Sequence, residues 1–74
     1  MKTFAFTILL EGVVKVTERL ETSLFEAGCD DALLWQSKGK VGLDFTRSAR
    51  SKKEAVQSAL NDIRRAGLRQ TVMA

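Results

Sequence analysis

The sequence predicts an α+β sandwich in which two helices cover one face of a four-stranded antiparallel sheet. Residues 3–10 and 41–46 alternate between apolar and polar side chains, which is typical of strands. Residues 18–27 and 52–66 carry apolar side chains at helical spacing. Two shorter strands complete the order β-α-β-β-α-β, and right-handed crossovers then place both helices on the same face. We therefore expect one ferredoxin-like domain over residues 1–74.

The first half of the chain begins with a strand and a helix. One row of strand side chains is apolar and faces the expected core: Phe4, Phe6, Ile8 and Leu10. Thr17 is suited to cap the helix that follows, and Gly28 is suited to end it in a left-handed conformation. The expected apolar stripe of this helix consists of Leu20, Leu24, Phe25 and Ala27.

A hairpin and a second helix make up the rest. Residues 32–36 form a short strand, and a turn at Gly39 leads into the strand 41–46, whose core side carries Val41, Leu43 and Phe45. Ser51 and Glu54 have the spacing of a capping box at the start of the second helix. The expected stripe of that helix is Val56, Ala59, Leu60 and Ile63, with Gly67 as its end and residues 69–73 as the last strand around Val72.

Composition excludes several classes of function. The chain has 74 residues, with no histidine and one cysteine, so His-dependent nucleophilic catalysis, a His-bound metal, an internal disulfide and a Cys-rich zinc site are ruled out. No segment approaches the roughly 18 continuous apolar residues of a membrane span, and no signal-peptide pattern opens the chain. We expect a cytoplasmic, non-enzymatic protein without a cofactor, and a homo-oligomer because so small a domain gains stability from further burial.

Charge differs between the two halves of the chain. Residues 1–37 hold three bases and six acids, a net charge of −3, whereas residues 38–74 hold nine bases and three acids, a net charge of +6. The basic half predicts contact either with an anion such as nucleic acid or with the acidic half of a second copy. A nucleic-acid interface would use a basic patch made of Lys52, Lys53, Arg64, Arg65 and Arg69.

The sheet face opposite the helices is the expected interaction surface. It carries alternate residues of the strands, and we single out Trp35, Leu9, Thr7 and Asp44. Trp35 is suited to anchor a protein interface. Asp44 needs a partner, which Arg47 or Lys40 could supply, and a pocket near Asp44 and Arg47 is the one place where a small enzyme could be built.

Recognition of RNA by stacking, which other domains of this topology use, is not favoured. The run Lys38–Phe45 matches the basic, glycine and buried positions of the RNA-recognition signature. The two positions whose exposed rings stack on bases are occupied here by Lys40 and Gly42.

Cys29 and the adjacent acids Asp30 and Asp31 are candidates for a reactive thiol and a cation site. Cys29 follows the end of a helix and has acids beside it, which raises the pKa of a thiol, so we expect a small, partly buried residue. Asp30 and Asp31 could bind a hard cation, but a polar turn that enters a strand is the favoured interpretation because further oxygen ligands are missing.

Three segments resemble a bacterial family of small proteins. They are Leu24–Ala32 (LFEAGCDDA), Val41–Arg47 (VGLDFTR) and the run from Ser51 that contains EAVQSA. In longer members of that family this domain precedes a DNA-binding helix-turn-helix, and the resemblance implies an accessory or oligomerisation domain. The family brings no catalytic or binding residues with it. The chain departs from the family at Thr46 and Ser48, where acids are usual.

Overall fold

The computed structural model describes residues 1–13 and 15–73 and contains the six predicted elements in the predicted order. They are β1 (Lys2–Glu11), α1 (Glu18–Glu26), β2 (Ala32–Ser37), β3 (Lys40–Ala49), α2 (Lys52–Arg65) and β4 (Arg69–Met73). The helix ranges agree with the prediction to within one residue. β3 is longer than the predicted 41–46 because it pairs with β1 from Val41, opposite Leu10, to Ala49, opposite Lys2.

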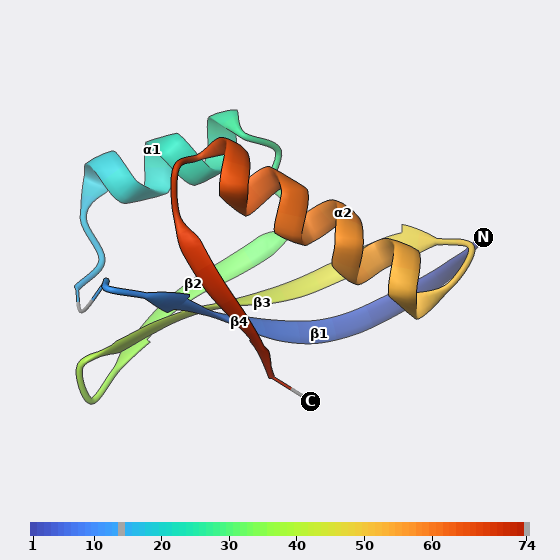
Figure 1. The fold of residues 1–74 in the computed structure, drawn as a ribbon, viewed down its shortest axis with the longest axis horizontal. Coiled ribbons are helices and arrows are strands. Elements are labelled where there is room, and N and C mark those ends of the chain that lie inside the picture. Colours follow the sequence, from blue (N-terminus) through green and yellow to red (C-terminus); the bar gives the residue numbers. More distant parts are fainter. Residues whose placement is uncertain (14, 74) are drawn as a thin grey trace.

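The four strands form one antiparallel sheet in the order β2-β3-β1-β4, so β2 and β4 are its edges. Both helices lie on the same side of this sheet (Figure 1). The β2–β3 hairpin turns at Lys38 and Gly39, both of which have positive φ, 50° and 75°. Positive φ at both central residues is the geometry of the tight hairpin turn that matches strand twist.

The core fills the space between the sheet and the helices. The sheet contributes Phe6, Ile8, Leu10, Val41, Leu43 and Phe45, and the helices contribute Leu24, Ala55, Ala59 and Ile63. The rings of Phe6 and Phe45 are stacked on adjacent strands with centroids 5.3 Å apart. Alternation in the strands therefore predicted the core face correctly.

The buried faces of the two helices differ from the predicted apolar stripes at two points. Phe25 is 67% exposed, so its assignment to the core was wrong, because the side of α1 that carries it lies beyond the sheet-facing stripe around Leu24. In α2 the fully buried row is Ala55, Ala59 and Ile63, whereas Val56 and Leu60 are partly buried. Small alanines on this row let the helix lie close to the sheet.

The predicted caps are confirmed. Leu20 N donates to Thr17 Oγ1 at 3.1 Å, and Glu54 N donates to Ser51 Oγ at 3.2 Å. Both hydroxyls satisfy an amide that lacks a partner within its helix. Gly28 has a φ of 108°, a conformation that favours glycine and turns the chain from α1 toward β2.

Candidate functional site

The uncovered sheet face carries Trp35 on its edge strand β2. Trp35 on β2 lies directly opposite Gly42 on β3, and the indole covers that glycine. A Cβ at Gly42 would lie 2.6 Å from Cε2 of Trp35, so only glycine leaves room for the ring. Trp35 is partly buried as a result, and Gly42 is buried beneath it. Leu9 on β1 is opposite Gly42 on its other side and is also partly buried.

Asp44 holds the ring in this position. Its Oδ1 accepts a hydrogen bond from Trp35 Nε1 at 3.0 Å and another from Thr7 Oγ1 at 2.7 Å. The four residues predicted for this face, Trp35, Leu9, Thr7 and Asp44, therefore lie together in the structure. The indole, with one end fixed by a carboxylate and one side packed on backbone, has little freedom to move.

The predicted partners of Asp44, Arg47 or Lys40, were wrong, because neither forms an ion pair with it within the described part of the chain. Arg47 lies three positions further along β3, and successive side chains of a strand point to opposite faces, so Arg47 points to the helix side. Asp44 and Arg47 thus do not share a pocket. A hollow of about 440 Å³ beside Asp44 is lined by β1 and β3 residues and by Lys52, but not by Arg47.

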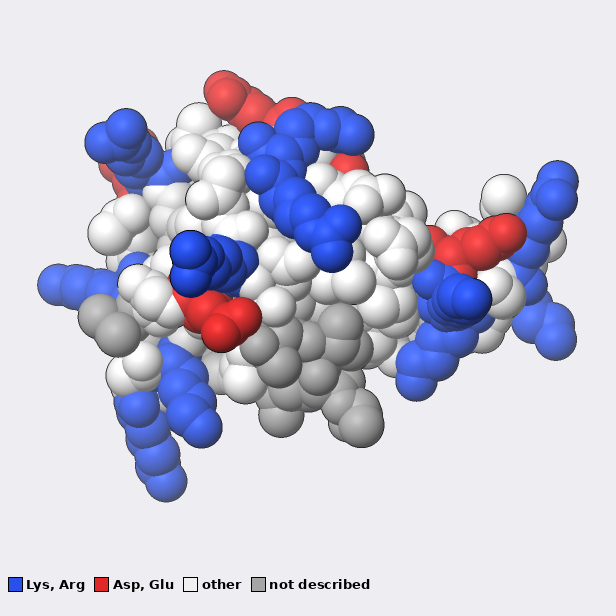
Figure 2. Space-filling view, in the orientation of Figure 1, with Lys and Arg blue, Asp and Glu red and all other residues white. Residues whose placement is uncertain are grey.

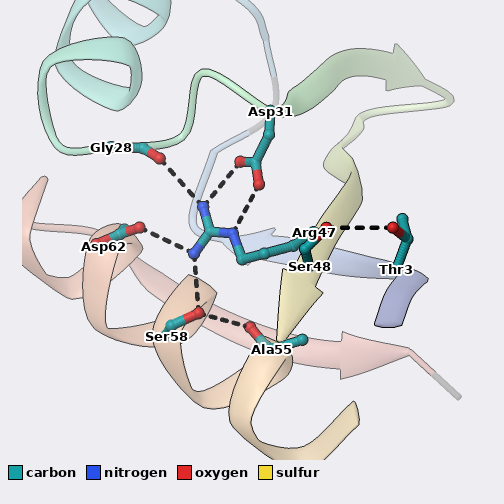
Figure 3. A network of polar contacts seen from close by, with 8 residues as sticks. All are labelled: Thr3, Gly28, Asp31, Arg47, Ser48, Ala55, Ser58 and Asp62. Carbon is teal, nitrogen blue, oxygen red and sulfur yellow. Dashed lines mark hydrogen bonds and ion pairs between the residues drawn. The ribbon is translucent and has the colours of Figure 1, made fainter. Parts of the chain in front are cut away.

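Arg47 is the centre of a polar network that was not among the predicted sites (Figure 3). Its Nε and Nη2 donate to the two carboxylate oxygens of Asp31 at 2.7 and 2.8 Å, and Nη2 also donates to Gly28 O at 3.1 Å. Its Nη1 donates to Asp62 Oδ2 at 3.0 Å and to Ser58 Oγ at 3.1 Å. Five bonds account for all five N–H groups of a guanidinium.

This network joins three parts of the chain at one end of the core. Arg47 comes from β3, Asp31 and Gly28 from the segment between α1 and β2, and Ser58 and Asp62 from α2. The Arg47 side chain is only 12% exposed, and its guanidinium lies 5.0 Å from the ring centroid of Phe45. The sequence does contain a signal that Arg47 faces the core side, because Arg47 follows Val41, Leu43 and Phe45 as the next alternate residue of the strand.

The network decides what Asp31 and Cys29 can do. The hydrogen bonds from Arg47 lower the pKa of Asp31 and occupy both of its oxygens, so the polar turn is the correct interpretation and Asp31 is not free for a cation. No cluster of three metal-ligating side chains occurs among the described residues. Cys29 is buried, and its burial, followed by the charge of Asp62, raises the pKa of the thiol to about 11.

The predicted basic patch does not form one cluster. Lys52 and Lys53 lie at the start of α2, and Arg64 and Arg65 lie at its end, about 18 Å away at 1.5 Å per residue. Arg65 Nη1 lies 3.8 Å from Asp62 Oδ1, and Arg69 on β4 has Glu11 on β1 as its partner in the strand register. Figure 2 shows basic side chains at several separate places on this face of the molecule, with acidic ones among them.

Comparisons of the chain with protein-family models, with curated proteins and with solved structures gave no match. Among the described helices, none is both long and apolar enough to cross a membrane.

Proposed function

We propose that the chain is a non-enzymatic protein-interaction module whose uncovered sheet face associates with a second copy. The observation that carries this proposal is the low charge of the face around a fixed aromatic ring. Trp35 packs on Gly42, and the neighbouring Leu33 is 70% exposed. Asp44, the acid that lies on β3 between these β2 residues and β1, accepts hydrogen bonds from Thr7 and Trp35. Exposed apolar groups around an immobilised tryptophan are typical of an interface centre.

The immobilisation of Trp35 supports binding in a second way. A side chain that is ordered before binding loses little conformational entropy when a partner covers it. The bond to Asp44 satisfies the indole N–H within the domain, so the exposed part of the ring offers apolar surface without an unpaired donor.

A second copy is the favoured partner because of the small size of the domain. A domain of 74 residues buries a modest fraction of its surface when it folds, and association adds to that burial.

Sedimentation velocity over a wide range of concentrations tests this proposal. We expect Leu33→Ser to weaken self-association by about tenfold or more. The matched control is Phe25→Ser, because Phe25 is equally exposed, at 67%, but lies on the helix side of the sheet. A chain that stays monomeric at every concentration and salt, or that loses association equally in both variants, would rule the proposal out.

A second candidate function is accessory nucleic-acid binding, and the observation in its favour is the net charge of +6 over residues 38–74. Phosphate contacts would make the affinity fall steeply as salt rises. Amide NMR spectra recorded with DNA and RNA at low salt distinguish the two candidates. Shifts at Lys52, Lys53, Arg64, Arg65 and Arg69 that disappear with salt support nucleic-acid binding, and unchanged spectra reject it.

The finer assignments from the sequence belong to the same proposal. The β-α-β-β-α-β order and the placement of both helices on one face support a ferredoxin-like class. The LFEAGCDDA segment supports kinship with the small bacterial proteins described above. A cytoplasmic location is part of the same proposal.

A further inference from the structure

A groove of about 310 Å³ lies between α1 and the edge strand β2, away from the Trp35 ring. Its lining includes Glu21, Phe25, Asp30, Ala32, Leu34 and also Leu33, which borders the uncovered sheet face. Phe25 at its rim is 67% exposed although it is a large apolar side chain. The groove therefore combines an apolar lining with an edge strand.

The backbone of β2 along this groove lacks a strand partner. Residues that face each other in an antiparallel pair alternately exchange two hydrogen bonds and none. Asp31 and Thr46 form a hydrogen-bonded pair, because Thr46 N donates to Asp31 O at 3.2 Å. The pairs Leu33–Asp44 and Trp35–Gly42 lie two and four residues further along β2 and are therefore hydrogen-bonded pairs as well. The N–H and C=O groups of Ala32, Leu34 and Gln36 then point away from β3. No described strand pairs with that edge.

The sequence of β2 does not protect this edge. Natural edge strands usually carry lysine, proline or a bulge that prevents pairing with another chain. The strand Ala32–Ser37 reads ALLWQS and contains no charged residue and no proline. An unprotected edge beside an apolar groove is the arrangement that domains use to accept an added strand.

Charge indicates which kind of strand would fit. The two ionisable side chains that flank the groove, Glu21 and Asp30, are both acidic and exposed, and neither forms an ion pair within the described chain. Helix α1 adds Glu18 and Glu26 against a single base, Arg19. Pairing of β2 with β2 of a second copy would bring two such acidic helices side by side, which like charges disfavour.

We propose that this groove binds an extended segment of another protein as an additional strand beside β2, and that the groove-facing side chains of this segment, at every second residue, include apolar groups together with lysine or arginine. The backbone groups of Ala32, Leu34 and Gln36 supply the pairing, the apolar lining receives the apolar side chains of that face, and Glu21 and Asp30 select for bases on the same face. This activity goes beyond the proposed self-association, because it uses the free edge of β2 and its helix side.

A random peptide library displayed on phage and panned on the intact chain tests the inference. We expect the enriched sequences to carry apolar residues and lysine or arginine together at positions i, i+2 and i+4, which share one face of a strand. A synthetic peptide of the enriched sequence should slow hydrogen exchange at the amides of Ala32, Leu34 and Gln36. The double variant Glu21→Lys/Asp30→Lys should lose affinity by about tenfold or more, since attraction becomes repulsion.

The matched control is Glu11→Lys/Glu54→Lys, which changes the net charge equally at exposed acids outside the groove and outside α1 and should change affinity less than about twofold. Absence of enrichment, enrichment of acidic peptides, or equal losses in both double variants would overturn the inference. Peptides that instead perturb the amides around Trp35 would also overturn it while leaving the proposed sheet-face interface intact. Slow exchange at Ala32 and Leu34 in the peptide-free dimer would show that a second copy occupies the edge.

Discussion

Arg47 and Asp31 form a two-bonded ion pair, with Nε–Oδ2 at 2.7 Å and Nη2–Oδ1 at 2.8 Å, although 16 positions separate them in the sequence. The same guanidinium also contacts Asp62 on α2 at 3.0 Å. Because these acids come from different elements, the arginine links β3, the segment before β2 and α2 at the edge of the core. The planar fork of arginine suits this task, and lysine could not make the same set of bonds.

Replacement of Arg47 by methionine should destabilise the fold strongly. Arg47→Met keeps much of the side-chain volume but leaves Asp31 and Asp62 without compensation, so we expect a loss of about 3 kcal/mol in the free energy of unfolding. Urea denaturation followed by circular dichroism measures it. Arg50→Met, at an exposed base just beyond β3, is the control and should change stability by less than about 0.5 kcal/mol. Equal effects of the two changes would contradict a structural role for the network.

The pairing of Asp31 also predicts a dependence of stability on pH. Arg47 lowers the pKa of Asp31 in the folded state below its ordinary value of 3.8, so the unfolded chain binds a proton first as the pH falls. The stabilisation by the pair is therefore complete above the unfolded pKa and is lost as the pH falls through the folded pKa.

Measurements of the free energy of unfolding from neutral to acid pH check this prediction. The wild-type chain should lose stability more steeply on acidification than Asp31→Asn, which has no carboxylate to protonate at that position. Asp30→Asn provides the comparison, because Asp30 is adjacent, exposed and outside the network. Parallel profiles for wild type and Asp31→Asn would show that the pair does not contribute.

Gly42→Ala should disturb the sheet face specifically through Trp35. The new Cβ would lie 2.6 Å from Cε2 of the indole, so the ring must move and its bond to Asp44 is strained or lost. We expect a cost of about 1–3 kcal/mol and a shift in tryptophan fluorescence. In Trp35→Ala the same glycine replacement should cost much less, and a double-mutant cycle measures this coupling. Additive effects would mean that the ring does not cover Gly42 in solution.

Cys29 should react slowly with alkylating reagents. Burial of the thiol is the main cause that raises its pKa from an ordinary 9.0 to about 11, which reduces the reactive thiolate at neutral pH by about a hundredfold. Modification by iodoacetamide, followed by mass spectrometry, should be slow in the folded chain and fast in urea. Rapid labelling without denaturant would indicate that the segment after α1 opens readily.

Local patterns were enough to predict the elements. Alternation along β1 and β3, together with the cap residues Thr17 and Ser51, depends on neighbouring positions only, so the strands, the helix starts and the core face of the sheet could be derived from the residues themselves. The grouping of Trp35, Leu9, Thr7 and Asp44 on one face follows from the same alternation.

Tertiary structure alone decided how the charged groups pair and which side of each helix is covered. Proximity in the sequence suggested Arg47 or Lys40 as a partner of Asp44. Asp31 and Asp62 reach Arg47 instead, and they do so only because two other segments meet at that end of the core. Phe25 is exposed because the orientation of α1 on the sheet leaves the side of the helix that carries Phe25 uncovered. The periodicity of the apolar residues does not specify this orientation. Contacts between distant segments depend on how whole elements pack, and no local pattern of residues encodes that packing.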